Sequence, residues 1–507
     1  MNFKITVLPE NRIITAEKNS CLSHVLTQNG ISISAPCGGN GKCGKCKVKL
    51  IKASAGDLKP DSKGMIKSCK TVITEDLIIE IPNTLSNEIS LWCSAERPPE
   101  NAELGVALDI GTTTIAAGLV DLKRGSIYKK ATCLNPQSIF GGDVLSRITA
   151  CSNGHLLDLQ KLILQKISDI LNAFGSDNSL MLEEMTVAAN TTMLHLLIGA
   201  DPTPMGTYPF TPAFTDIKHI RGEELGLNVK NVTLLPSISA YIGADISSGI
   251  LATNLQNAED TALFVDIGTN GEMALSHKGK IYVSSTAAGP AIEGASMECG
   301  LGGVPGAVNR VFLRGGKFGF TTVENLPPKG ICGSGYVDLI ALLLKENLID
   351  EYGGWNLNSS SVIREKLKND RFYLTDDVFL SLQDIHEFQL AKAAIAAGIN
   401  TLMRHCDVET KDVNRVYLAG GMGYYINTHS AATTGLLPKN LSFKAKAVEN
   451  TSLKGAEICL MEPNKLKELE KITQNAQVVE LSLSEHFQSE YTSNLIFNKN
   501  LFVTKKT

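Results

Sequence analysis

Polar and apolar residues alternate along the beginning of the chain with the period of strands that bury one face. Two such runs flank the turn Pro9-Glu10-Asn11, which predicts a hairpin. After Ser20, a suitable N-cap, apolar residues recur at helical spacing until Gly30, which predicts one amphipathic helix. The strands expected in this part of the chain are residues 3–8, 12–15, 46–51 and 76–82. Residues 1–82 are therefore predicted to form a compact α+β domain.

The stretch 83–103 has no sustained period of either kind and contains the step Arg97-Pro98-Pro99, which is typical of a linker. Beyond it, residues 104–507 alternate short apolar runs with longer amphipathic segments, which is the pattern of an α/β fold. The clearest strands expected are 104–109 and 262–266, and the clearest helices are 157–173 and 388–403.

Two segments within this α/β region resemble one another. Residues 106–113 read VALDIGTT and residues 263–270 read LFVDIGTN, so each apolar run ends in Asp followed by Ile-Gly-Thr. The two aspartates, Asp109 and Asp266, are 157 residues apart. A repeat of this kind predicts two lobes that are built alike, the second with its first hairpin near residue 262.

The composition limits the classes of function. The 507 residues include 43% hydrophobic and 20% charged residues, as in ordinary globular proteins, and the length suits about three domains. No run approaches the roughly 20 apolar residues that cross a bilayer, and the opening Met1-Asn2-Phe3-Lys4 lacks the apolar core of a signal peptide. We therefore expect a cytoplasmic protein without a membrane partner. The net charge of −4 provides no overall basic field, so nucleic acid is not expected as a partner.

Four of the twelve cysteines have the spacing of a metal centre. In the cytosol, where reductants keep most disulfides open, cysteines are considered first as thiols, ligands or redox groups. The spacing is C-x5-C-x2-C, and a fourth cysteine follows after 22 intervening residues. Glycines in the loop allow backbone N–H groups to point at thiolate and sulfide. This asymmetric pattern favours a [2Fe-2S] cluster over the paired knuckles of tetrahedral zinc. The predicted ligands are Cys37, Cys43, Cys46 and Cys69, and the glycines are Gly38, Gly39, Gly41 and Gly44.

Two further cysteines lie near this group in the sequence. Cys93 is a rival for the fourth ligand, but it falls in the predicted linker, whereas Cys69 precedes a predicted strand. Cys21 stands alone on the predicted helix, as a core cysteine would. Around the loop, nine lysines outnumber two aspartates. These lysines are either a solvated face or functional. A functional role would be to dock an acidic redox partner or to raise the cluster potential through their field. Both alternatives stay open.

The repeated Asp-x-Gly-Thr segments have the chemistry of a phosphate site. A strand that ends in Asp and continues into a Gly-Thr turn presents N–H and hydroxyl donors to phosphates, while the carboxylate can reach a Mg²⁺-bound water. One copy is a common turn, but two copies after apolar strands, Asp109–Thr114 and Asp266–Glu272, are a much stronger signal. Residues 416–423, VYLAGGMG, add a glycine-rich strand end. The chain contains neither a Walker A sequence nor a G-x-G-x-x-G after a first strand.

In order and spacing, these three segments resemble the two phosphate hairpins and the adenosine motif of the actin, sugar kinase and Hsp70 superfamily. Residues 330–335, GICGSG, are similar to its connecting motif, or they form a plain close helix contact. The resemblance implies a two-lobed α/β ATPase that follows an α+β, β-grasp ferredoxin-like domain.

Together, the iron–sulfur domain and the ATPase resemble the ATP-dependent reductive activators of corrinoid proteins. Further phrases that look like this family lie at residues 135–137, 142–147, 189–195, 289–295 and 435–438. The resemblance implies reduction of an inactive Co(II) corrinoid protein to Co(I), which reactivates a corrinoid-dependent methyltransferase system. It implies a [2Fe-2S] cluster, ATP and Mg²⁺ as cofactors. The implied partners are the corrinoid protein and an upstream low-potential electron donor, and a homodimer is allowed.

The resemblance also implies roles for single residues. Asp109 and Asp266 would hold the Mg²⁺ shell, and Asn190 and Glu293 would position the attacking water. His195, in an apolar stretch, is expected in the core. Phosphate contacts are implied for Gly111, Thr112, Thr113, Thr114, Gly268, Thr269 and Asn270, and adenosine contacts for Gly420, Gly421 and Met422.

The chain departs from the family pattern at two places. Residues 299–303 lack the Met-Arg expected after Cys-Gly, and Glu449 replaces a usual Gly, so the nucleotide contacts near 299–303 and 448–456 are not carried over. The first phosphate hairpin also begins only about twenty residues after the ferredoxin-like domain. We therefore expect the separate middle domain of some relatives to be missing, and with it any dimerisation through that domain.

Three other functions compete with this interpretation. A small-molecule kinase with a redox-sensing iron–sulfur domain would have the same two-lobed fold, because fold does not decide function. An activator of 2-hydroxyacyl-CoA dehydratases also couples ATP to electron transfer, but it carries a [4Fe-4S] cluster between subunits, which does not fit a four-cysteine ferredoxin-like domain. An actin-like scaffold fused to an electron carrier would lack ATPase activity with a corrinoid partner.

Overall fold

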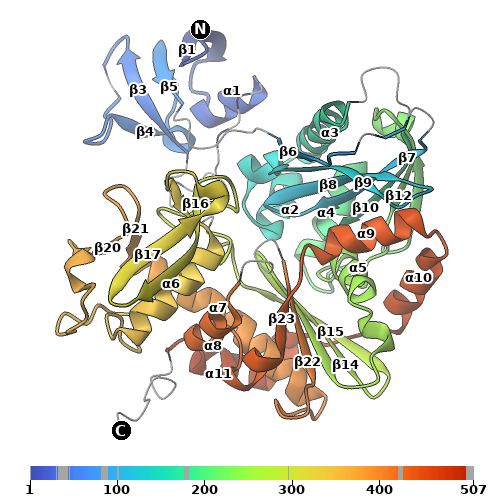
Figure 1. Ribbon diagram of the computed structural model, residues 1–507. Helices are drawn as coiled ribbons and strands as arrows, with labels where there is room; N and C mark the ends of the chain where they lie inside the picture. Colours follow the sequence, from blue (N-terminus) through green and yellow to red (C-terminus); the bar gives the residue numbers. More distant parts are fainter. Residues whose placement is uncertain are drawn as a thin grey trace.

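The computed structural model describes residues 2–29, 31, 33, 41, 44, 46–56, 58–81, 89–96, 98, 99, 102–175, 182–294, 296–420 and 426–497. These residues form an N-terminal domain and two larger lobes (Figure 1). Among the helices described, none has both the length and the apolar character needed to cross a membrane.

The N-terminal domain is a mixed sheet with one helix packed against it (Figure 1). Its elements are β1 (Asn2–Leu8), β2 (Arg12–Glu17), α1 (Leu22–Gln28), β3 (Lys47–Ala53), β4 (Met65–Lys67) and β5 (Leu77–Glu80). The strand order is β2-β1-β5-β3-β4, with β1 and β5 parallel and the other pairs antiparallel. Alternation puts Ile5, Val48 and Ile79 on the face that packs against Leu22 and Leu26 of α1. The predicted ferredoxin-like domain is confirmed.

The first lobe is a sheet of seven strands in the order β11-β12-β10-β7-β8-β9-β6. Its strands are β6 (Ser90–Cys93), β7 (Leu104–Ile110), β8 (Thr114–Asp121), β9 (Ile127–Leu134), β10 (Leu182–Ala189), β11 (Lys218–Arg221) and β12 (Val229–Leu234). Its helices are α2 (Val144–Ser152), α3 (Leu156–Ala173), α4 (Thr191–Ile198) and α5 (Ala244–Ala252). Strand β6 pairs with β9, so part of the segment predicted as a linker, 83–103, belongs to this sheet.

The second lobe is built on a sheet in the order β23-β22-β13-β14-β15-β24, with two small sheets beside it, β17-β16-β18 and β19-β20-β21. The main strands are β13 (Ala262–Ile267), β14 (Asn270–His277), β15 (Lys280–Ala287), β22 (Arg415–Ala419), β23 (Ala445–Ala447) and β24 (Gln477–Val478). The small sheets contain β16 (Ala307–Arg314), β17 (Lys317–Thr322), β18 (Gly330–Ile331), β19 (Leu367–Lys368), β20 (Arg371–Tyr373) and β21 (Phe379–Ser381). The helices are α6 (Gly333–Lys345), α7 (Leu382–His405), α8 (Thr428–Thr434), α9 (Thr451–Met461), α10 (Lys465–Asn475) and α11 (Glu485–Ser493).

The two large sheets repeat one topology. The order β9-β8-β7-β10-β12 in the first lobe is matched by β15-β14-β13-β22-β23 in the second, and in both the last two strands run parallel to the central one. The predicted two-lobed α/β fold is confirmed. Register then positions the site, because Asp109 pairs with Ala188 and Asp266 with Ala419. The residues that follow β10 and β22 therefore lie beside the two phosphate hairpins.

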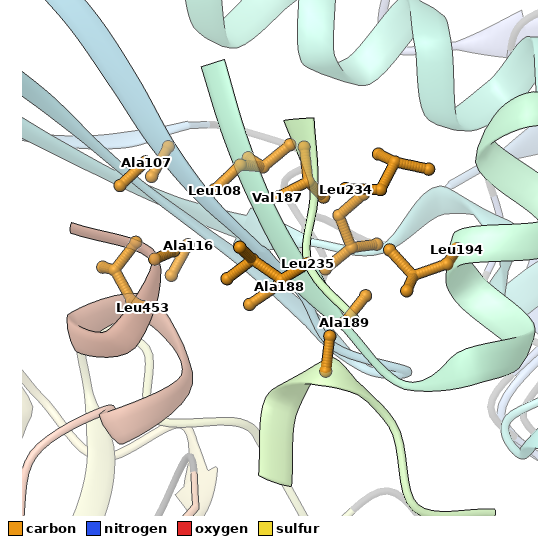
Figure 2. Packing of buried hydrophobic residues seen from close by; sticks show 14 of the residues in the cluster. Ala107, Leu108, Ala116, Val187, Ala188, Ala189, Leu194, Leu234, Leu235 and Leu453 are labelled. Carbon is orange, nitrogen blue, oxygen red and sulfur yellow. The ribbon is translucent and has the colours of Figure 1, made fainter. Parts of the chain in front are cut away.

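The lobes meet along helices α5 and α9. Helix α9 lies within the sequence of the second lobe, before β24, but it packs on the sheet of the first lobe, where Leu453 lies near Ala116 (Figure 2). Gly455 of α9 approaches α5 so closely that a Cβ there would lie 2.5 Å from the carbonyl oxygen of Ser248. A small residue is therefore required where the two helices meet.

The N-terminal domain contacts the first lobe through aromatic rings. The ring of His24 on α1 lies 6.2 Å from the ring of His155, which in turn lies 5.0 Å from the ring of Phe140. Phe140 precedes α2, so the side of the domain that carries α1 faces the first lobe (Figure 1).

Candidate nucleotide and cluster sites

The first phosphate hairpin joins β7 to β8. The N–H of Gly111 donates to the carbonyl oxygen of Thr114 over 2.9 Å, which closes a tight turn. A Cβ on Gly111 would lie 2.6 Å from that same oxygen, so the turn requires glycine. The hydroxyls of Thr112 and Thr113 are thereby held at the end of a buried strand, as the sequence predicts.

Asp109 ends the central strand of the first lobe and faces the start of α9. Its carboxylate accepts hydrogen bonds from Asn450 Nδ2 and Ser452 Oγ, each over 2.7 Å. Burial raises the pKa of Asp109 above its usual value, and these two hydrogen bonds oppose the shift. The segment 448–456, where the family pattern breaks, therefore contacts the predicted site directly.

The second hairpin, between β13 and β14, repeats the first. The N–H of Gly268 donates to the carbonyl oxygen of Asn270 over 2.9 Å, and Thr269 is buried in the turn. Gly420, at the end of β22, has φ of +103°, and a Cβ there would lie 2.3 Å from the carbonyl oxygen of Ile267. Glycine is needed at this position for both reasons. Gly421 and Met422 lie outside the described residues.

Glu293 joins the two hairpins. Its Oε2 accepts a hydrogen bond from Thr113 Oγ1 over 2.7 Å and another from Thr269 Oγ1 over 2.6 Å. One carboxylate oxygen is thus shared by the two turns that were predicted to bind phosphate, one from each lobe. These three side chains therefore come together where the two hairpins meet, and we call this place, with the carboxylates around it, the predicted cleft.

Asn190 lies beside the first hairpin and makes structural hydrogen bonds there. It is the N-cap of α4, where its Oδ1 accepts from the N–H of Met193 over 2.9 Å. Its Nδ2 donates to Thr112 Oγ1 over 3.0 Å. Asn190 therefore positions the first hairpin. His195 is fully buried, as expected of a core histidine. Its Nδ1 donates to the carbonyl oxygen of Thr191, and its Nε2 accepts from the N–H of Ala213.

Two carboxylates of the cleft were not among the predicted site residues. Asp245 stands in the first turn of α5, and Glu272 lies on β14 opposite Asp266. Burial and the nearby Asp109 raise the pKa of Asp245 to about 7. Burial, followed by the charges of Asp245 and Asp266, raises the pKa of Glu272 well above its usual value. Asp266 is shifted in the same direction, first by burial and then by Asp245, Asp109 and Glu293.

Arg147 is the buried cation next to this group. It is 0% exposed and donates to the carbonyl oxygen of Thr112, to Gln137 Oε1 over 3.2 Å and to the carbonyl oxygen of Gly141 over 3.2 Å. Burial lowers its pKa to about 9, against the favourable charges of Asp143 and Glu293. The family segment 142–147 thus stabilises the first phosphate turn, through the hydrogen bond from Arg147 to the backbone of Thr112.

The predicted cluster site is described in part. Cys46 is fully buried, and its Sγ lies 3.1 Å from the Sγ of Cys69. Gly41 and Gly44 have φ of +75° and +69°, in agreement with the need for glycine in the loop. Cys37 and Cys43 lie outside the described residues.

The rival ligand Cys93 and the expected core residue Cys21 differ in position. Cys93 is exposed on β6, in the sheet of the first lobe. Cys21 Sγ lies 3.6 Å from the carbonyl oxygen of Cys69. Among the described side chains, no group of three His, Cys, Asp or Glu is arranged to bind a metal ion directly.

Sequence models of known families match the chain in three consecutive parts. The 2Fe-2S iron-sulfur cluster binding domain matches residues 5–74, the RACo middle region matches residues 104–258, and the C-terminal domain of RACo, the ASKHA domain, matches residues 260–505. The matched middle region coincides with the first lobe, which begins with the strand of the first phosphate hairpin. The expectation that a separate domain ahead of this hairpin is missing stays a prediction.

Proteins similar to this one match most of the chain. The corrinoid activation enzyme RamQ of Eubacterium limosum is 31% identical over 425 residues, which are 79% of this chain and 71% of RamQ. The Co(II) methylated amine-specific corrinoid protein reductase of Methanosarcina barkeri is 26% identical over 438 residues, 78% of this chain and 77% of that protein. A solved structure of a reductive activator for corrinoid, iron-sulfur protein superposes with a TM-score of 0.74 at 28% identity, covering 99% of this chain and 100% of that chain.

Proposed function

The chain belongs to the family of ATP-dependent reductive activators of corrinoid proteins, and from this premise we propose that it reduces an inactive Co(II) corrinoid protein to Co(I). This step would restore a corrinoid-dependent methyltransferase system, for example an O-demethylase. The [2Fe-2S] cluster of the N-terminal domain supplies the electron when it is bound, and the two lobes bind ATP.

One observation supports the ATP-dependent part of this proposal, namely the pair of hydrogen bonds by which Thr113 and Thr269 share Glu293. Hydroxyls that donate to a carboxylate oxygen can donate in the same way to a phosphate oxygen. With phosphates between the hairpins, Glu293 would lose both donors and become free to hold the attacking water. Nucleotide binding would then change the contact between the lobes.

The carboxylates of the cleft fit a divalent cation. Burial raises the pKa values of Asp109, Asp245, Asp266 and Glu272, and neighbouring carboxylates raise them further for the last three. The donors to Asp109 are neutral. A cluster of like charges of this kind gains from a bound cation. We propose that Asp109 and Asp266 hold the water shell of Mg²⁺, which would offset the charge of the phosphates.

ATP is needed because the electron must move to a very low potential. A plant-type [2Fe-2S] cluster has a potential near roughly −400 mV, and for one electron each further 59 mV costs about a factor of ten in the equilibrium. The Co(II)/Co(I) couple lies well below that value. Closure of the lobes on ATP can supply the difference if it changes the affinity for one cobalt state.

The remaining parts of the proposal concern ligands and partners. Cys37, Cys43, Cys46 and Cys69 are the proposed cluster ligands, and an upstream low-potential carrier in the cytoplasm is the proposed source of electrons. Sedimentation of the loaded protein would test whether the chain forms a homodimer.

The direct experiment is optical. The protein, a strong reductant, ATP and a Co(II) corrinoid protein are mixed, and formation of Co(I) is followed by absorbance. Formation of Co(I) should require ATP. Equal rates without ATP would refute the coupling, and stoichiometric phosphorylation of a small acceptor would indicate a kinase instead.

A pair of variants connects this assay to the cleft. Glu293→Gln should lower ATP hydrolysis and ATP-dependent Co(I) formation by about 10²-fold, the usual scale for loss of a group that activates water. The matched control is Glu298→Gln, whose carboxylate pairs with Arg371 outside the cleft. The control should keep both rates, and the paramagnetic signal of the reduced cluster should be the same in both variants.

A further inference from the structure

One face of the N-terminal sheet carries a row of lysines. Strands β3 and β4 are antiparallel with Val48 opposite Ile66, and both of these side chains are buried in the core. Because side chains alternate, the neighbouring pair Lys47 and Lys67 points to the other face of the sheet. Lys49 lies on this face for the same reason.

A bulge in β3 places a further lysine on the same face of the sheet. The register shifts between Leu50 and Lys52, so that Leu50 pairs with the buried Ile79 and Lys52 pairs with Ile78. Lys52 therefore returns to the face occupied by Lys49 instead of turning into the core. We call the side chains Lys47, Lys49, Lys52 and Lys67 the lysine face.

The acidic residues next to this face are already neutralised. Asp61 pairs with Lys47 over 2.7 Å and also accepts from backbone N–H groups, which lowers its pKa to about 2, and Glu80 pairs with Lys49 over 3.2 Å. Lys52 and Lys67 are exposed and have no ion-pair partner in the part of the chain that the structure describes. The face therefore has a net positive charge.

This charge belongs to the N-terminal domain and not to the whole protein. Residues 1–82 contain twelve Lys and Arg against seven Asp and Glu, a formal charge of +5, whereas the whole chain has a net charge of −4. The remaining residues therefore carry a formal charge of −9. A basic domain on an acidic protein directs an acidic partner to one end of the molecule.

The lysine face also reaches the cluster loop. Lys67 Nζ donates to the carbonyl oxygen of Gly41 over 2.6 Å. The side chain of Lys70, next to Cys69, lies so close to Gly41 that a Cβ there would be 2.8 Å from Lys70 Cε. A protein that contacts the lysine face is thus brought up to the loop that carries the predicted cluster ligands.

We propose that the lysine face is the docking site of an acidic one-electron carrier protein that reduces the [2Fe-2S] cluster. The inference rests on the proposed function, for which it identifies where electrons enter. One electron passes from the reduced carrier to the cluster, which gains one unit of negative charge, and no bond or proton changes place.

The position of the face favours the electron donor over the corrinoid protein. The domain contacts the first lobe through His24 on α1, whereas β4 is an edge strand at the other side of the sheet (Figure 1). A partner whose binding depends on the nucleotide must contact the lobes, since they hold the nucleotide. A donor needs only the cluster, and the lysine face offers access to it.

The test compares two double charge reversals in the full-length protein with its cluster. Lys52→Glu with Lys63→Glu changes the charge of the face and its border without touching the cluster loop, because both side chains are exposed. Arg12→Glu with Lys18→Glu makes the same change of net charge at the opposite edge, at and beyond β2. Reduced flavodoxin, an acidic carrier, is the probe, and the rate of cluster reduction is measured by stopped flow at low and high salt.

We expect the variant on the face to lose about tenfold in the bimolecular rate at low salt, with a weaker salt dependence, and the control to stay within twofold of the parent. Equal rates for both variants would identify the lysines as a solvated face and overturn the proposal. Lys67→Gln serves as a third variant, and its cluster potential is measured to separate docking from an effect on the cluster itself.

A second measurement distinguishes the two possible partners. With dithionite as reductant in place of the carrier, ATP-dependent Co(I) formation should be unchanged in the variant on the face. If this rate falls while reduction by flavodoxin does not, the face binds the corrinoid protein and the proposal is wrong. If the parent protein forms no Co(I) at all, the proposed function fails, while the flavodoxin comparison still decides the docking site.

Discussion

Asp245 provides a quantitative test of the carboxylate cluster in the cleft. Its pKa is about 7 in the folded protein, against an ordinary value of 3.8. Between these two values the side chain is protonated in the native state and ionised in the unfolded chain, so a rise in pH favours unfolding. At about 1.4 kcal/mol per pH unit over about three units, the free energy of unfolding falls by up to about 4 kcal/mol. This is an upper bound, because Asp245 is only half-buried.

The substitution Asp245→Asn removes this titration. Denaturant unfolding of the variant and the parent, without nucleotide and divalent cations, is measured from pH 5 to pH 8. The charge of Asp245 also raises the pKa values of Asp266 and Glu272, so the difference between the two free energies of unfolding reports Asp245 together with its effect on these neighbours. The variant should gain up to about 3 kcal/mol relative to the parent across this range, with most of the gain below pH 7.

Asp216→Asn is the control for this experiment. The pKa of Asp216 is lowered, first by its hydrogen bond to Lys218, so this carboxylate is ionised throughout the range in both states. The difference between Asp216→Asn and the parent should therefore be flat with pH. A flat difference for Asp245→Asn as well would show that its carboxylate ionises normally, and the argument from mutual repulsion in the cleft would be refuted.

Three further substitutions test other parts of the sites. Gly420→Ala should lower nucleotide affinity at least tenfold in a calorimetric titration, because the added Cβ would lie 2.3 Å from a carbonyl oxygen. The control Gly279→Ala has φ of +72° and open space around the added Cβ, so it should lower the free energy of unfolding by only about 1 kcal/mol. Arg147→Met should lower the free energy of unfolding by about 3 kcal/mol, since it leaves buried acceptors without donors, and an unchanged denaturation midpoint would contradict this. Cys69→Ser should alter or abolish the paramagnetic signal of the reduced cluster, and Cys93→Ser should leave it intact.

The phosphate hairpins could be predicted because their signal is local. A strand, an aspartate and a Gly-Thr turn are contiguous in sequence, and the turn of Gly111 has the close contact that requires glycine. Asp245 could not be found in this way. It stands at the start of an ordinary helix, and only the packing of α5 against the site brings it near Asp109. Glu272 was visible in the second hairpin, but strand alternation alone did not show that it faces the cleft.

Short strands were missed for a related physical reason. Strand β4 has three residues and β6 has four, and every residue of β6 is exposed, so no alternation of buried and exposed positions marks it. Such edge strands form because a longer partner offers free backbone groups, in this case β9 for β6. That partner is distant in sequence, so the pattern within 83–103 resembles a linker.

The repeated topology explains why carboxylates from both lobes gather at one place. Two copies of one sheet order bring Asp109 and Asp266, each at the end of a central strand, to the same cleft, and the start of α5 adds Asp245. Burial raises the pKa values of all three carboxylates, and for Asp245 and Asp266 the charges of neighbouring carboxylates raise them further. On the proposed function, Mg²⁺ would offset this charge when the phosphates take the hydroxyls from Glu293. Because Asp245→Asn removes one of these carboxylates, the variant should bind Mg²⁺ and ATP more weakly than the parent although it is more stable.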